Sequence, residues 1–230
     1  MRIMALAAAV VATACSAGNA RSVADSTTTA SADGDVSSAL PTDVMPAGAV
    51  RYVVSGSNTA RYRVREQLLG QDLPNDAIGE TTEITGAITV DSTTGTLVAG
   101  QSKFVVNTGA FKSDKDRRDG YVRGRLLESA KFPTVEFVPT AVRGLTAANA
   151  WVQGPKTFEL TGDLTVRGVT RPTTWRISAQ QGNGKATGSA TTKFTFADFT
   201  ITPPKVPVLL SVADTIALEY DFTMVREGKP

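Results

Sequence analysis

Large apolar residues alternate with polar or small ones along most of the chain from Arg51 onward. The clearest run, near the C-terminus, places Ile216, Leu218, Tyr220, Phe222 and Met224 between Ala217, Glu219, Asp221 and Thr223. A period of two is typical of a strand with one buried face. With the Gly, Asn, Asp and Pro residues between runs, the pattern predicts strands at 51–54, 60–65, 81–90, 97–106, 134–142, 158–166, 174–181, 185–196 and 215–225.

Strands with one buried apolar face and one solvated face favour an antiparallel sheet. Closing such a sheet into a barrel removes its unpaired edges. With about eight strands, the interior is either filled by side chains or just wide enough for one small ligand. We therefore predict an all-β fold, an antiparallel, lipocalin-like barrel of about eight strands with one or two short helices.

The alternation also predicts which side chains face the interior. Gly86, Gly162 and Gly188 fall on inward faces, where they either leave room for a ligand or mark bends in the strands. Aromatic residues there are ordinary core candidates, although the hydroxyls of Tyr62 and Tyr220 need partners if buried. The residues expected to line the cavity are Tyr62, Val64, Ile84, Ile88, Phe104, Val106, Phe137, Leu160, Leu164, Trp175, Ile177, Phe196, Leu218, Tyr220 and Phe222.

Two stretches combine the strand pattern with other signals. Ser113 followed by Asp114 and Asp116 predicts the N-cap of a short helix, and Pro133 ends that segment before a strand begins. Phe158, Leu160, Leu164 and Val166 share one strand face, and a turn at 167–170 follows.

These stretches resemble the YceI-like family of polyisoprenoid-binding, lipocalin-like proteins, in which RD…L…KFPTVEF, LTGDLTVRGVTRP and DTIALEYDF recur in this order. The resemblance covers roughly residues 51 to 225. It implies a barrel that holds an extended lipid, and hence binding, sequestration or transport of an isoprenoid or similar long-chain lipid without catalysis. The family often carries His near its first strand and after the RD pair, whereas this chain has Ser57 or Asn58 and Tyr121 there.

The N-terminal 50 residues predict export. Residues 1–15 combine Arg2, an apolar run too short to span a bilayer and small residues before Cys15, which resembles the lipobox of bacterial lipoproteins. The alternative is cleavage after Ala17 or Ala20, which removes the cysteine. Residues 16–50 are rich in Ser, Thr, Ala and Asp and predict a disordered tether. We therefore expect the 51–228 barrel in the cell envelope, facing the periplasm or the exterior and held at a membrane by lipidated Cys15.

Charge and composition narrow the function. Two Arg and four Asp give the first 50 residues a net charge of −2, and the remainder carries +4 because the whole chain carries +2. Neither this balance nor any motif predicts nucleic-acid binding. The chain has no His, and its one Cys lies in the predicted signal peptide. This excludes Ser-His-Asp and Cys-His catalysis, an ordinary zinc site and a histidine or cysteine haem ligand. We expect no cofactor and no metal.

Several features keep more than one interpretation. The carboxylates Asp114, Asp116, Asp119 and Glu128 are better explained by helix capping than by hydrolysis. Arg117, Arg118, Arg123 and Arg125 either receive an anionic head group or form a solvated face, while Arg118 with Asp119 is expected to brace the helix to the barrel. The loop from Pro203 to Leu210 either forms an apolar edge at a cavity mouth or packs on the outside of the barrel. The alternative to lipid binding is a solid-cored interaction or scaffold module with no small-molecule ligand.

Overall fold

The computed structural model describes residues 45–150 and 154–228. The predicted signal peptide, Cys15 and most of the predicted tether lie outside these residues and stay predictions. Residues 49 and 50, the last two of the predicted tether, belong to the first strand. Within the described ranges, no helix has the length and apolar character that a bilayer crossing requires.

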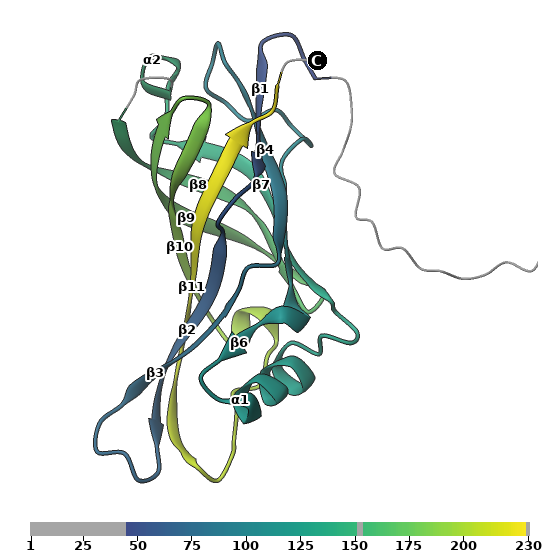
Figure 1. Cartoon of the computed structure of the whole chain (residues 1–230). Helices are drawn as coiled ribbons and strands as arrows, with labels where there is room; N and C mark the ends of the chain where they lie inside the picture. Colours follow the sequence, from purple (N-terminus) through teal and green to yellow (C-terminus); the bar gives the residue numbers. More distant parts are fainter. Residues whose placement is uncertain (1–44, 151–153, 229–230) are drawn as a thin grey trace, which may run out of the picture. The chain divides into compact units, whose positions relative to one another are not determined.

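In the described residues, eleven strands form one antiparallel sheet (Figure 1). The strands are β1 (Ala49–Val54), β2 (Thr59–Leu68), β3 (Asn75–Thr81), β4 (Ile84–Asp91), β5 (Lys103–Asn107), β6 (Lys112–Ser113), β7 (Thr134–Arg143), β8 (Gly154–Val166), β9 (Val169–Gly182), β10 (Lys185–Thr195) and β11 (Leu209–Arg226). The helical segments are α1 (Asp116–Tyr121), a π-helical turn (Val122–Leu126), α2 (Ala147–Ala150) and 3-10 turns at Thr108–Ala110 and Ala197–Phe199.

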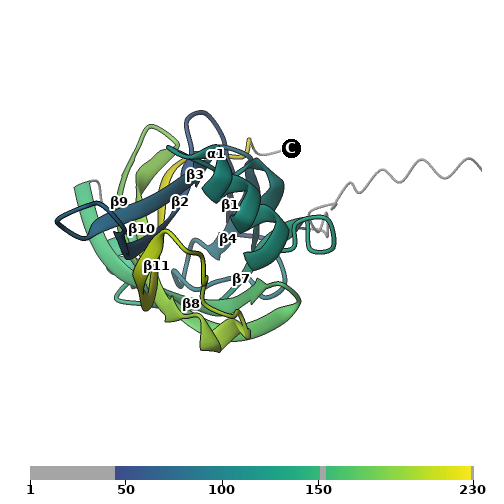
Figure 2. The ribbon, with the colours of Figure 1, turned by 90° about the horizontal axis from the view of Figure 1, so that it is seen from below.

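The sheet closes because its first and last strands pair with each other, with Val53 of β1 opposite Val225 of β11. The ring runs in the order β1, β4, β5, β7, β8, β9, β10, β11 and back to β1, and Figure 2 shows it from one end. The predicted antiparallel barrel of about eight strands is therefore confirmed, as is the all-β class with short helices.

At one end of the barrel, which we call the α1 end, three strands outside the ring extend the sheet. β2 pairs with both β11 and β3, and β3 pairs with β6. Between β6 and β7 the chain forms α1 and the π-helical turn, and Val122 and Leu126 of that turn face the interior. Figure 1 shows α1 and the β2–β3 loop at this end, away from α2.

The hairpin of β8 and β9 follows the predicted motif closely. Its strands pair from Gly154 with Gln181 to Val166 with Val169. The turn itself is two residues long, and both Arg167 (φ 50°) and Gly168 (φ 73°) have positive φ. This geometry fits a two-residue turn whose twist matches that of the flanking strands.

Three element predictions are wrong in detail. Strand β3 was missed, because its inward residues Ala77, Gly79 and Thr81 are small and its sequence has the composition of a turn. The predicted strand at 97–106 is regular only from Lys103. Gln101 and Ser102, just before this strand, instead lie against β4. There the buried Thr89 donates hydrogen bonds of 2.9 Å from its amide to Ser102 Oγ and from its hydroxyl to the Gln101 carbonyl.

The helix start is the third correction. α1 begins at Asp116 with Lys115 as its N-cap, and Ser113 belongs to β6. The physical reason is the buried carboxylate of Asp119, whose Oδ1 accepts hydrogen bonds from the Ser113 amide at 2.8 Å and the Ser113 hydroxyl at 2.6 Å. Ser113, which we expected to cap the helix, instead lies on β6 and joins that strand to the helix through Asp119.

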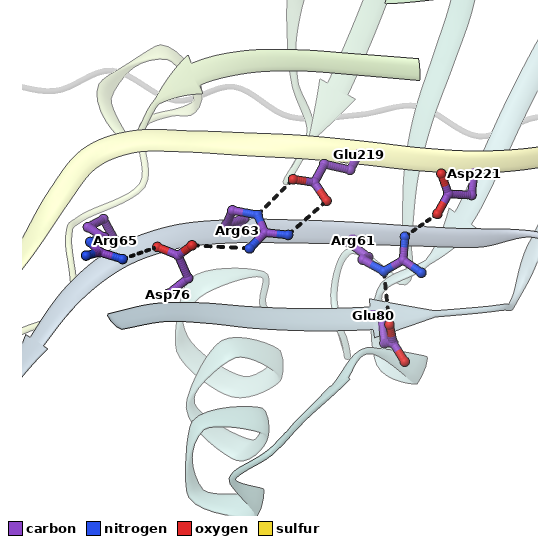
Figure 3. Close-up of polar contacts among 7 residues, drawn as sticks. All are labelled: Arg61, Arg63, Arg65, Asp76, Glu80, Glu219 and Asp221. Atoms are coloured by element: carbon purple, nitrogen blue, oxygen red, sulfur yellow. Dashed lines mark hydrogen bonds and ion pairs between the residues drawn. The ribbon is translucent and has the colours of Figure 1, made fainter. Parts of the chain in front are cut away.

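The outer face of β2 carries alternating arginines that pair with carboxylates on both neighbouring strands (Figure 3). Arg63 lies at the centre, 2.8 Å from Glu219 of β11 and 3.2 Å from Asp76 of β3. The flanking pairs are Arg61 with Glu80 and with Asp221, and Arg65 with Asp76. These ion pairs clamp β2 between its neighbours and leave the other face of the strand to the apolar interior.

Candidate functional site

The barrel encloses a large cavity of about 1180 Å³. Its wall is built mainly from the inward faces of the strands, and every residue predicted to line it does so. Contact of these residues with a ligand stays a prediction. The volume exceeds the roughly 300–1,000 Å³ that is usual for small-molecule sites. The interior is therefore hollow, which contradicts the solid-cored alternative.

Sequence reasoning left several wall residues out of the site. Phe158, Val166 and Met224 share strand faces with predicted residues, so the same period of two locates them. Residues from outside the long strand runs, such as Phe111 and Leu127, also line the wall. No repeat in the sequence marks these, because the tertiary fold brings their loops to the barrel.

The inward glycines are covered by aromatic rings on neighbouring strands. A Cβ atom added at Gly79 would lie 2.3 Å from the Tyr62 ring, which shows how closely the ring packs on the glycine backbone. Similar close contacts join Gly86 with Phe104, Gly162 with Phe137 and Gly188 with Phe222. The room that these glycines leave is thus taken by rings that pack against the wall. We had expected the glycines either to leave room for a ligand or to mark bends in the strands, and neither interpretation describes them fully.

The hydroxyls of Tyr62 and Tyr220, the two tyrosines predicted to face the interior, have different surroundings. Tyr220 donates a hydrogen bond of 2.8 Å to Oδ1 of the buried Asn58, and burial raises the pKa of Tyr220 above its usual value. Asn58, at about the place of a family His, is held by further bonds to the backbone. The Tyr62 hydroxyl has no hydrogen-bond partner among the described residues, and burial raises its pKa to about 12.

At the α1 end the cavity reaches the surface. Exposed residues such as Lys115, Arg117 and Val208 line it there beside the apolar Leu68 and Val206, and we call this opening the mouth. At the opposite end the wall includes Tyr52 and Met224, which pack with Val50 in a second buried cluster.

The loop from Pro203 to Leu210 forms part of the mouth. Pro204, Val206, Pro207, Val208 and Leu209 all line the cavity. Val208 is nevertheless 56% exposed, so its side chain borders both the cavity and the solvent. The structure thus favours a place at the cavity mouth for this loop over packing on the outside.

The arginine cluster near the helix does not act as one unit. Arg118 pairs with Glu66 of β2 at 2.6 Å and also with Asp114. Arg123 donates to the Phe111 carbonyl at 3.0 Å. Arg117 and Arg125 are exposed. Because Arg118 already pairs with Glu66 and Asp114, it braces α1 to the barrel, as predicted, and is not free to select an anionic head group.

The acidic residues near the helix are also largely engaged. Asp114 pairs with Arg118, Asp119 bonds to Ser113, and Glu128 pairs with Arg167. In the part of the chain that the structure describes, no group of His, Cys, Asp or Glu side chains is arranged to hold a metal ion. Most of the cavity wall is an apolar surface.

Comparison with known proteins agrees with this architecture. The model of the YceI-like domain matches residues 56–224. A UPF0312 protein of Shewanella denitrificans is 28% identical over 62% of this chain and 73% of its own length. A UPF0312 protein of Pseudomonas putida is 34% identical over 43% of this chain, and the match spans about half (51%) of that relative.

A similar fold occurs in a polyisoprenoid-binding domain from Saccharophagus degradans that is implicated in plant cell wall breakdown. That structure superposes with a TM-score of 0.60 at 13% identity, covering 76% of this chain and 98% of the domain. At this identity the likeness concerns the fold.

Proposed function

The chain belongs to the YceI-like family, and from this membership and the cavity we propose that it binds a long-chain polyisoprenoid or similar apolar lipid inside the barrel, to sequester or carry it without catalysis. The observation that carries the proposal is the apolar cavity of about 1180 Å³ with a mouth at one end. Its wall on β8 extends from Phe158 to Val166, which is about 27 Å of strand. An extended tail of several isoprene units fits such a wall.

Tail burial dominates the expected energetics. Burying one CH₂ group contributes roughly 0.8 kcal/mol, so a five-carbon isoprene unit contributes about 3 to 4 kcal/mol before the entropy of ordering the tail. One head-group hydrogen bond contributes only about 0.5 to 1.5 kcal/mol. With Arg118 already paired, we expect affinity to follow tail length far more than head-group chemistry.

Replacing Leu160 by Trp tests the proposal. Leu160 is buried in the cavity wall, and a larger ring there occupies the space of the tail. After incubation with a long-chain polyprenyl alcohol and gel filtration, we expect the lipid that mass spectrometry finds on Leu160→Trp to fall at least about tenfold. The loss of folding stability should stay within about 1–3 kcal/mol.

The matched control is Asp163→Trp, which adds the same ring to the exposed face of β8. We expect this variant to bind as much lipid as the unmodified protein. Equal binding by Leu160→Trp and Asp163→Trp would refute occupation of the barrel interior.

We also propose that the protein is exported to the cell envelope and that acylated Cys15 holds it at a membrane surface. The support is the sequence of residues 1–15. The intact mass of protein from its native cell tests this, because a mature chain starting at acylated Cys15 differs from one cleaved after Ala17 or Ala20. Either of the shorter chains would overturn the anchor.

A further inference from the structure

Large apolar side chains are exposed on two loops at the α1 end of the barrel. Leu69 and Leu73 on the β2–β3 loop are 66% and 76% exposed, and Val208 and Leu210 at the start of β11 are 56% and 59% exposed. The loops are adjacent, because the Leu69 amide donates a 2.9 Å hydrogen bond to the Val208 carbonyl. We call these four residues the lip.

The geometry of β11 turns part of the lip outward. The register of β11 with β2 shifts between Leu209 and Ser211, so Leu210 has no partner in the ladder. An irregularity of this kind re-aims a side chain. Here Leu209 lines the cavity while Leu210 lies 59% exposed.

The lip is continuous with the mouth. Leu68 and Leu209 pair across β2 and β11 and both line the cavity, and Val208 belongs to both surfaces. An apolar path therefore runs from the outside of the molecule to the cavity wall. Exposed apolar surface that is grouped in this way marks an interaction site.

From this continuity we propose that the lip inserts into the surface of a phospholipid bilayer, so that a lipid passes between membrane and cavity through the mouth. The inference rests on the proposed function, because a cargo with a long apolar tail is itself dissolved in membranes. The exposed charges on these loops and around the mouth balance, because three are acidic and three are basic: Asp72, Asp114, Asp116, Lys115, Arg117 and Lys205. The contact is thus with the apolar layer of a neutral bilayer, and it depends little on anionic head groups.

The test uses the full chain with Cys15→Ser, so that no acyl anchor holds it to vesicles. In this background Leu69→Ser, Leu73→Ser and Leu210→Ser are combined, since none of these leucines lines the cavity. Sedimentation with phosphatidylcholine vesicles measures membrane binding, and vesicles that contain a polyprenyl alcohol measure its transfer to the protein. We expect vesicle partitioning and transfer rate both to fall at least about tenfold, because several buried CH₂ groups are lost and about 1.4 kcal/mol is a factor of ten. Binding of the unmodified protein should change little between low and high salt.

Met45→Ser is the matched control, because Met45 is another exposed apolar residue, 39% exposed and outside the lip; it should leave both quantities unchanged. The combined variant should still take up the alcohol when it is added from ethanol. If the combined variant takes up the alcohol from ethanol and its vesicle binding and transfer are unchanged, the lip proposal is overturned. The proposed function is then unaffected. The lip could instead hold two copies of this chain together. A protein that binds no vesicles but forms a dimer, which the three changes dissociate, would also overturn the proposal. Absence of uptake from ethanol by the unmodified protein contradicts the proposed function itself.

Discussion

The phenol of Tyr62 lies where the apolar cavity wall meets the charged groups at the mouth. Its ring packs on Gly79, while Arg118, Asp119 and Glu66 act on its hydroxyl electrostatically. Burial is the largest influence and raises the pKa of Tyr62 to about 12. The neutral phenol is therefore the form that the folded barrel favours, and it can pair with an uncharged oxygen of a ligand.

This pKa makes stability depend on alkaline pH. The pKa of Tyr62 is higher in the folded state than the ordinary value of 10.0, so its contribution is complete below pH 10 and is lost as the pH rises from 10 to 12. The loss attributable to Tyr62 is at most about 3 kcal/mol. We expect Tyr62→Phe to lose less stability than the unmodified protein between pH 9 and 12 in denaturant titrations. Parallel curves for the two proteins would show that the phenol is not buried as described.

At the residue scale, sequence periodicity predicts which side chains face the interior but not which residues they contact there. The period of two placed Tyr62 and Gly162 on inward faces, and the structure agrees. The ring that fills the space over each glycine comes from the neighbouring strand, so it depends on strand register. Register is not visible in one strand's pattern, which explains why two interpretations of the glycines stayed open.

At the scale of elements, β2 shows how one strand serves both faces of the wall. Tyr62 and Val64 line the cavity, while Arg61, Arg63 and Arg65 pair with carboxylates outside. Exposed ion pairs usually contribute only about 0.2–1 kcal/mol each, although networks contribute more. Arg61 and Arg63 each pair with a carboxylate on β3 and another on β11, so the loss of either affects both neighbouring strands.

Replacing Arg63 by Met tests this clamp and keeps the apolar stem of the side chain. We expect the free energy of unfolding to fall by about 1 kcal/mol at low salt, and by less at high salt because salt screens partly exposed charges. Arg65→Met is the control, since Arg65 has a single acidic partner and a side chain that is 56% exposed. If the two variants lose the same stability in denaturant titrations, the bridging position has no special weight.

Elements with long alternating runs were predicted well, and elements fixed by their neighbours were not. The β8–β9 hairpin follows its apolar pattern and turn residues. Strand β3 carries small inward residues, because the large ring over Gly79 belongs to β2. Likewise, Ser113 has the composition of a cap, but its partner Asp119 and its pairing with Gly79 place it in a strand. Such choices are made by tertiary contacts.

At the scale of the whole barrel, closure of the sheet and retention of a cavity are separate properties. Alternation predicted closure, because a sheet with one dry face and no free edge forms a barrel. Whether side chains fill the interior depends on where bulky residues lie in three dimensions. Here Phe104, Phe137 and Phe222 each lie over a glycine of the adjoining strand, and the cavity measures about 1180 Å³. The sequence alone left this question open.

The most direct test of lipid binding is native mass spectrometry of the protein purified from its own cell under gentle conditions, followed by organic extraction. We predict a bound mass in near one-to-one ratio with the protein, and extraction should release a lipid with a long apolar tail. A protein that emerges with only its own mass, and yields no lipid on extraction, would contradict the account.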